Sequence, residues 1–478
     1  MADLNDDIFF ASIAELGAKL KAREITALDL TNGFCDRLER LGPRYNALAL
    51  SLREPAIRAA RDVDTELKRG RYRGPLHGIP FAVKDLISVA NQITTWGARP
   101  YAAQVFDYDA TVVTKLTGAG AILIGKLAMV ELAGGGGYNS PNASLFGPGL
   151  NPWNPSRWAG GSSSGSGSAV AAGLIPFALG SETSGSILTP SAFCGVTGLR
   201  PTFGLVSRFG AMALSWTMDK IGPMCRTAED CGLVLRVIAG SDGNDPSSSG
   251  KSFYYAPQFG REMKDVKVAY APVDFEEWAD PTTRDAFRKA LDILKDVGVQ
   301  LVEAKLPDLP YGAVTSTIIA AEGASSFESL IANGKVDQLA DKRQIEGLKA
   351  ALDIPARDYL KAMRIRRIIQ QEVRQILTDT DVILAPARGT VAPPINQPLD
   401  VSLGLGGRTP PASQGMQALI PAGNLAGLPA ISLPCGLVDN LPIALSLVSR
   451  PFTENLILTI GNEFQKRTDW HRRRPNAS

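Results

Sequence analysis

The stretch "WAGGSSSGSGSAVAAG", residues 158–173, has an unusual composition, because ten of its sixteen residues are glycine or serine. Such a composition is typical of flexible linkers. It is also typical of backbone that packs so closely around another group that only small side chains fit. The polar "NPWNPSRW" precedes the stretch and the apolar "LIPFALG" follows it. A buried strand directly after the stretch argues against a linker and predicts a short helix of small residues.

Phosphate-binding loops are a second interpretation of a glycine-rich stretch, and the details of this one disfavour them. The P-loop pattern requires Gly-Lys-Ser/Thr, and residues 158–173 contain no lysine. The dinucleotide-binding pattern G-x-G-x-x-G requires a strand immediately before it, where this chain has "NPWNPSRW". Neither kind of nucleotide site is therefore expected here.

A second glycine- and serine-rich cluster, "GSETSGSILTPSAFCG", spans residues 180–195. The two clusters are separated by one predicted helix and one predicted strand, so they can meet at one end of a sheet. Small residues allow backbone N–H groups to approach a reacting atom, as an oxyanion hole requires. The serines of both clusters are candidate nucleophiles, and a serine nucleophile needs a base.

The chain has only two histidines that could act as this base. His471 lies in the basic tail "DWHRRRPNAS" and is expected to be solvated, while His77 precedes an apolar strand and is expected to bond to backbone. Lys84 follows "IPFAV", and burial disfavours an ammonium ion, so a neutral Lys84 is a candidate base. The alternative is an ion pair between Lys84 and its neighbour Asp85, and the local sequence leaves both open.

Predicted strands and helices alternate along the chain. Strand-like runs occur at 79–85, 121–126 and 175–180, with the helical pattern "DATVVTKLTGAG" at 109–120 between two of them. Later strand-like runs are "VKVAYAP", "DVILAP" and "LPAISLPCGL". Such alternation predicts an α/β fold with a parallel or mixed sheet and helices on its faces.

Taken together, the two clusters resemble the amidase signature family. The resemblance continues through "PLHGIPFAVKD", "FGPGLNPWNPSRWAGG" and "NLAGLPAISLPCGL". It covers residues 5–470 and is weakest at 250–415. It implies an α/β/α sandwich around a central mixed sheet, and hydrolysis of a linear amide.

The resemblance also assigns catalytic roles to individual residues. Ser186 is the implied nucleophile, Ser162 the serine that relays its proton from within a cis peptide, and Lys84 the base. The implied acyl-enzyme is hydrolysed by water, with neither a metal ion nor a cofactor. The remaining implied residues are the oxyanion-hole amides of Thr183, Ser184, Gly185 and Ser186, and the supporting residues Gly161 and Ser163.

Three positions depart from the family pattern. Glu182 stands where the family usually has Asp, Ser184 where it often has Gly, and Leu188 where it commonly has Arg. The loss of a guanidinium at Leu188, with Met129 and Trp216 nearby in the motifs, predicts an apolar substrate pocket. We therefore expect an apolar acyl or aryl amide as substrate, with esters and carbamates (a urethanase activity) as further possibilities.

Two other functions are compatible with the same motifs. The glutaminase (A) subunit of a tRNA-dependent amidotransferase shares the triad, but residues 320–352 do not resemble the version expected of that subunit. A catalytically dead binding protein is the other alternative. The intact Lys84, Ser162 and Ser186 argue against it.

The whole chain of 478 residues is expected to form a single amidase-signature domain. Its sections are N-terminal helices (1–70), the signature core (71–245), a variable substrate-side segment (250–415) and C-terminal strands with a helix (416–478). The five cysteines form no C-x-x-C pair, which argues against a disulfide framework or a zinc site.

Composition sets the expected surroundings of the protein. Apolar residues make up 45% and charged residues 21%, an ordinary globular balance. A net charge of +2 is too small to indicate nucleic acid or an anionic membrane as partner. The N-terminus lacks a signal-peptide pattern, and no apolar run reaches the ~18 residues of a membrane span. We expect a cytoplasmic monomer or homodimer whose partner is a small-molecule amide.

Overall fold

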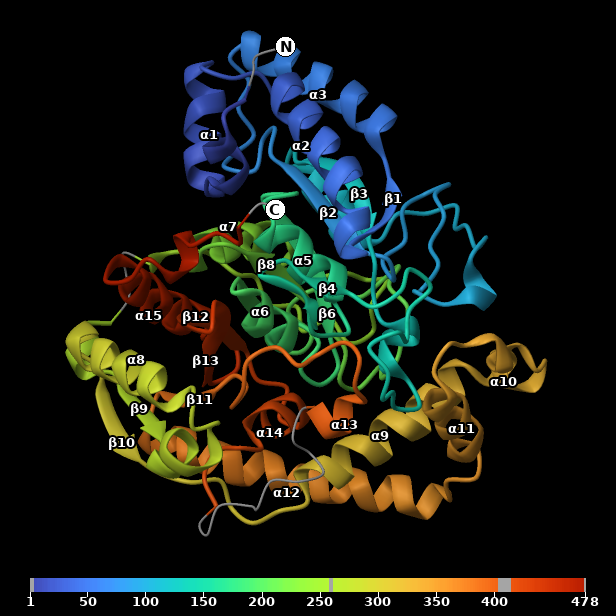
Figure 1. Cartoon of the computed structure of the whole chain (residues 1–478), viewed down its shortest axis with the longest axis vertical. Coiled ribbons are helices and arrows are strands. Elements are labelled where there is room, and N and C mark those ends of the chain that lie inside the picture. Colours follow the sequence, from blue (N-terminus) through green and yellow to red (C-terminus); the bar gives the residue numbers. More distant parts are fainter. Residues whose placement is uncertain (1–3, 258–260, 403–413, 477–478) are drawn as a thin grey trace.

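A central β-sheet dominates the computed structural model, which describes residues 4–257, 261–402 and 414–476. Within this part of the chain, eleven strands form one sheet in the order β1-β3-β2-β6-β8-β7-β12-β13-β11-β9-β10. Helices lie on both sides of the sheet (Figure 1), and parallel and antiparallel pairs both occur. The α/β/α sandwich with a mixed sheet that the resemblance implies is confirmed.

The strands of this sheet come from all four sections of the sequence. Their bounds are β1 Leu48–Ser51, β2 Pro80–Lys84, β3 Ile122–Leu127, β6 Phe177–Glu182, β7 Thr197–Arg200, β8 Lys220–Cys225, β9 Lys267–Tyr270, β10 Gln300–Glu303, β11 Val382–Pro386, β12 Ala430–Val438 and β13 Leu441–Ser449. A small separate sheet pairs β4 Leu150–Asn151 with β5 Asn154–Trp158.

The α-helices follow the amphipathic patterns of the sequence. Their bounds are α1 Ile13–Ala22, α2 Ala27–Leu41, α3 Arg53–Lys68, α4 Thr111–Gly118, α5 Ser164–Ala171, α6 Leu188–Cys194, α7 Ala228–Ile238, α8 Arg284–Val297, α9 Tyr311–Ser326, α10 Glu328–Ala332, α11 Lys342–Ala351, α12 Ala356–Asp379, α13 Leu399–Ser402, α14 Leu419–Leu425 and α15 Glu454–Lys466. Among the described residues, no helix is long and apolar enough to cross a membrane.

The N-terminal section contains a strand that the helical prediction for residues 1–70 missed. β1 has only four half-buried residues and pairs antiparallel with β3 at the edge of the sheet. Such a short run carries too little periodicity to be distinguished from a helix connection. α2 begins after Thr26, whose Oγ1 accepts a hydrogen bond from the Asp29 N–H at 3.0 Å and caps the helix.

The strands that carry the candidate site are buried on both faces. Every residue of β2, β6 and β8 is buried, as expected of a sheet covered by two layers of helices. β2 runs parallel to both β3 and β6, so the carboxyl ends of these strands lie at one edge. In α/β folds, this edge is where ligands bind.

The glycine- and serine-rich stretch is a packed helix. All eight residues of α5 are buried. A Cβ atom placed on Gly165 would lie 2.6 Å from the carbonyl oxygens of both Ala47 and Ala128, so any larger side chain would push the backbones apart. The small residues are therefore required by close packing, and the linker interpretation is excluded.

Replacing Gly165 by alanine should lower the free energy of unfolding by about 1–3 kcal/mol, because the added methyl group overpacks the core. Gly118, the last residue of α4, is a matched control, because nothing lies within 4 Å of a Cβ placed there. Gly118→Ala should be neutral or stabilising by about 0.5 kcal/mol. Urea unfolding followed by circular dichroism measures both, and equal stabilities of the two variants would contradict this packing.

Candidate active site

Lys84 is the last residue of β2 and is completely buried. Its Nζ donates hydrogen bonds to Ser162 Oγ at 2.7 Å and to Ser181 Oγ at 3.0 Å. Burial lowers the pKa of Lys84 to about 7, against the opposing effect of the negative charges of Asp219 and Glu182. A substantial fraction of Lys84 is therefore neutral near pH 7 and able to accept a proton.

The ion pair between Lys84 and Asp85, which the sequence left open, does not form. Asp85 instead pairs with Lys126 of β3 at 2.9 Å, and both of these side chains are buried. Asp85 also accepts a hydrogen bond from the backbone N–H of Thr95 at 3.0 Å. With Asp85 occupied in this way, Lys84 faces hydroxyl groups and has no carboxylate within ion-pair distance among the described residues.

Gly161 and Ser162 connect β5 to α5 through a cis peptide bond. A Cβ atom on Gly161 would lie 2.8–3.0 Å from atoms of Val130, Trp158 and Tyr138, so glycine is required there by space. The carbonyl oxygen of Ser162 accepts a hydrogen bond from the Val130 N–H at 3.1 Å. These contacts fix the backbone that holds the Ser162 hydroxyl against Lys84.

Ser163 joins the two glycine- and serine-rich clusters. Its N–H donates to the carbonyl oxygen of Ser186 at 3.3 Å. Its Oγ donates to the Ser181 carbonyl at 3.2 Å and accepts from the Ser181 N–H at 3.3 Å. The backbone of Ser186 is therefore held beside Ser163, the residue that follows Ser162, and Lys84 bonds to the Ser162 hydroxyl.

Ser186 lies in the turn between β6 and α6. Gly185 has a φ of +89°, a conformation that favours glycine, and a Cβ there would lie 3.1–3.3 Å from Thr189 Oγ1, Ile420 Cγ2 and Arg388 Nη2. Within the described chain, the N–H groups of Ser184, Gly185 and Ser186 donate no hydrogen bond to another residue. Three consecutive free donors beside a serine hydroxyl provide the chemistry of an oxyanion hole.

Glu182 holds this turn in place. Its Oε2 accepts hydrogen bonds from the N–H groups of Ile187 and Leu188 at 2.9 and 3.0 Å. Its Oε1 accepts from Arg200 at 2.8 Å and from Asn424 at 2.9 Å. Although burial alone raises the pKa of Glu182, the charges of Arg200 and Lys220 and these hydrogen bonds outweigh it and hold the pKa at about 2. The sequence marked Glu182 only as a departure from the family, and this role was missed.

Two hollows flank the segment 183–186. One, of about 160 Å³, is lined by Ser181, Thr183 and Trp216, and Trp216 is 43% exposed at its surface. The other, of about 260 Å³, is lined by Ser184 and Arg388. Arg388 was missed by the sequence analysis, because it lies in the section of weakest resemblance.

The other two predicted substrate contacts are both buried in the core. Met129 belongs to the main core, where its carbonyl oxygen and side chain leave no room for a Cβ on Gly97. Leu188 belongs to a second cluster that includes Met218 and Leu419. Their contact with substrate stays a prediction.

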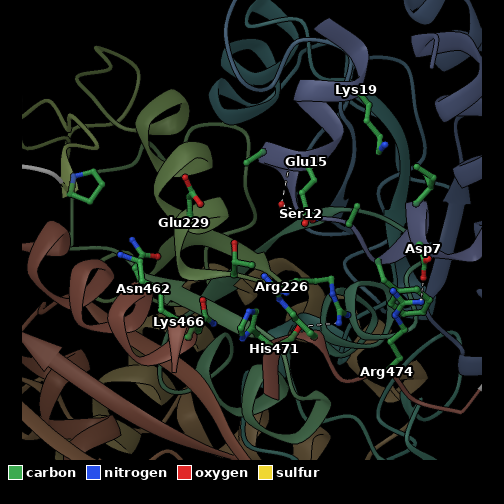
Figure 2. A pocket seen from close by; sticks show the side chains of 18 of the residues that line it. Asp7, Ser12, Glu15, Lys19, Arg226, Glu229, Asn462, Lys466, His471 and Arg474 are labelled. Carbon is green, nitrogen blue, oxygen red and sulfur yellow. Dashed lines mark hydrogen bonds and ion pairs between the residues drawn. The ribbon is translucent and has the colours of Figure 1, made fainter. Parts of the chain in front are cut away.

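The two histidines have different outcomes. His77 is buried and its Nδ1 accepts the Arg73 N–H at 3.2 Å, as expected for a structural histidine. The prediction of a solvated His471 is wrong, because the basic tail folds back and the Arg226 guanidinium donates to the His471 carbonyl at 2.9 Å. His471 lines a hollow of about 1100 Å³ between α1, α7 and α15 (Figure 2), and no candidate catalytic residue lines this hollow.

The family of the chain follows from comparison with known proteins. A family model described as amidase matches residues 29–458. The chain belongs to the amidase signature family. It is therefore an enzyme of a class that hydrolyses carbon–nitrogen bonds.

Three similar proteins illustrate the range of the family. The A subunit of glutamyl-tRNA(Gln) amidotransferase from Chloroflexus aurantiacus is 35% identical over 98% of this chain and 99% of the relative. The native peptide amidase of Stenotrophomonas maltophilia is 29% identical, with a TM-score of 0.83 and coverage of 98% of both chains. One chain of a vestigial protein complex that reveals the evolutionary origins of an s-triazine catabolic enzyme is 29% identical to this chain. Its TM-score is 0.85, with coverage of 96% of this chain and 98% of that chain.

These relatives correct the expected partners. The sequence predicted a free-standing monomer or homodimer that binds a small-molecule amide and no nucleic acid. Similarity over nearly the whole length to one subunit of a tRNA-dependent enzyme contradicts that expectation. The physical reason is that the motifs lie in the buried core, where a free-standing amidase and a subunit have the same requirements.

Glu182→Gln should lower the free energy of unfolding by about 3–5 kcal/mol, because it leaves Arg200 buried without its ion-pair partner. The control is Asp285→Asn in the exposed pair with Arg288, which should change stability by less than about 0.5 kcal/mol. Because the pKa of Glu182 is lowered from 4.5 to about 2, its stabilisation is complete above the unfolded value and is lost as the pH falls through the folded one. Denaturant unfolding between these pH values should show the wild-type advantage shrinking, and a constant advantage would contradict the ion pair.

Proposed function

We propose that the chain is the amide-hydrolysing A subunit of an amidotransferase, which releases ammonia from the side-chain amide of glutamine. The observation that carries this proposal is the 2.7 Å hydrogen bond between the buried Lys84 and Ser162, next to the turn that bears Ser186. The match over almost the full length of an amidotransferase A subunit favours glutamine over other amides. This ranking reverses the one that the sequence suggested.

In the proposed mechanism, the side chains of Lys84, Ser162 and Ser186 move one proton. Neutral Lys84 accepts the proton of the Ser162 hydroxyl while Ser162 accepts that of Ser186, and Ser186 Oγ attacks the amide carbon. The N–H groups of residues 184–186 stabilise the negative charge on the carbonyl oxygen. The carbon–nitrogen bond breaks, and the leaving nitrogen takes the proton back through Ser162. Water then adds to the acyl-enzyme by the same route and releases the acid.

A second candidate function is hydrolysis of an apolar acyl or aryl amide, or of a carbamate. The hollow beside Thr183 favours it, because Phe209, Leu214 and Trp216 give that hollow apolar walls. A carbamate would present its carbonyl group to Ser186 in the same way as an amide.

Ammonia release from glutamine, compared with product release from an anilide and a carbamate, separates the two candidates. We expect kcat/KM for glutamine to exceed that for the anilide by about tenfold or more, and to rise further when the other amidotransferase subunits of the source organism are added. Ser186→Ala should lower turnover about 10⁶-fold, because the triad acts as a unit. A preference for the anilide or carbamate that the added subunits leave unchanged would overturn the proposal in favour of the second candidate.

A further inference from the structure

The cavity of about 260 Å³ beside Ser184 is built from elements far apart in the sequence. It lies between residues of α9, the end of β11 and α14, and Ser184 of the nucleophile turn forms part of its wall. Arg388 Nη2 lies 3.3 Å from the position that a Cβ on Gly185 would take, one residue before Ser186. A ligand in this cavity would therefore reach the implied nucleophile through a short chain.

Arg388 brings a positive charge to the cavity, where no described carboxylate contacts it. Its Nε and Nη2 both donate to Thr189 Oγ1, at 3.1 and 2.6 Å, which leaves Nη1 without a hydrogen bond in the described chain. Among the described residues, no carboxylate lies within ion-pair distance of this guanidinium. The nearby Glu182 is paired with Arg200 instead. A half-buried guanidinium without a counter-charge is suited to bind an anion.

Three further polar groups of the same cavity lack partners. Thr315 Oγ1, Gln417 Nε2 and Ser446 Oγ are buried and form no hydrogen bond with any residue that the structure describes. Thr315 and Ser446 are only 6% and 1% exposed, so leaving their hydroxyls unpaired is costly. No aspartate or glutamate is among the described residues that line the cavity. Hydrogen-bond donors thus line this space, and none of its described lining residues carries a carboxylate.

We propose that this cavity binds a carboxylate at the acyl end of the substrate, with Arg388 as its charged partner. Thr315, Gln417 and Ser446 are placed to donate further hydrogen bonds to the carboxylate oxygens. The proposal rests on the proposed function, because glutamine carries such a carboxylate. The proposal goes further, because it states that this cavity does not recognise the α-ammonium group of glutamine. No described residue of the cavity has an acidic side chain to bind that group. Leu188 stands where the family commonly has Arg, and in this proposal Arg388, which follows β11, provides the guanidinium instead.

The substrate test compares glutaramate, which is glutamine without its α-amino group, with pentanamide, which also lacks the carboxylate. We expect kcat/KM for glutaramate to equal or exceed that for glutamine and to exceed that for pentanamide at least about tenfold. Arg388→Met should lower the ratio of kcat/KM for glutaramate to kcat/KM for pentanamide about 10- to 100-fold, mainly through KM for glutaramate. Arg157→Met is the matched control, because Arg157 is half-buried and, among the described residues, its guanidinium donates only to the Ala392 carbonyl, at 3.4 Å. Equal kcat/KM for glutaramate and pentanamide would overturn the proposal.

A binding measurement separates this proposal from the proposed function. Calorimetric titration of Ser186→Ala with glutaramate requires no turnover, so it is informative even if glutamine proves not to be a substrate. Adding Arg388→Met to Ser186→Ala should weaken glutaramate binding at least about tenfold, and unchanged binding would overturn the carboxylate site. Arg388→Gln retains a donor for Thr189 and replaces Arg388→Met if that variant fails to fold.

Discussion

The rest of the site depends on one constraint. The amine of Lys84 is buried, and no carboxylate of the described residues lies within ion-pair distance of it. The desolvated amine is stabilised by the hydroxyls of Ser162 and Ser181, at 2.7 and 3.0 Å. Two segments of backbone must approach the end of β2 to deliver these hydroxyls, and only small residues permit that approach. The glycine- and serine-rich composition of both clusters therefore follows from where Lys84 lies, and so does its lowered pKa.

The turn between β6 and α6, which bears Ser186, is held by a second buried group that contacts distant parts of the chain. Glu182 receives Arg200 from β7 and Asn424 from α14 on one oxygen, and the first amides of α6 on the other. The geometry of Ser186 thus depends in part on Asn424, which lies 242 positions after Glu182. The same turn faces the cavity lined by Arg388, so the proposed nucleophile and the proposed carboxylate site share one support.

The motifs predicted the fold and the contact between Lys84 and Ser162. Both depend on close backbone packing, which requires small residues that are visible in the local sequence. Whether Lys84 would pair with Asp85 could not be decided locally, because it depended on Lys126 from the neighbouring strand. Arg388 follows β11, and the order of the strands in the sheet brings the end of β11 to the site. No local sequence pattern indicates that Arg388 lies there. His471 looked solvated in a basic tail, but the tail packs against Arg226. Association with other subunits would be decided by the surface of the protein, which the catalytic motifs do not describe.

The pH dependence of covalent labelling by a fluorophosphonate, mapped by mass spectrometry, tests most directly whether Lys84 activates Ser186 through Ser162. We predict a single adduct on Ser186, formed at a rate that rises with pH and levels off above the Lys84 pKa of about 7. In Lys84→Met the rate should be low and should not rise across the same pH range. An adduct on another serine, or a Lys84→Met variant that is labelled at the wild-type rate, would contradict it.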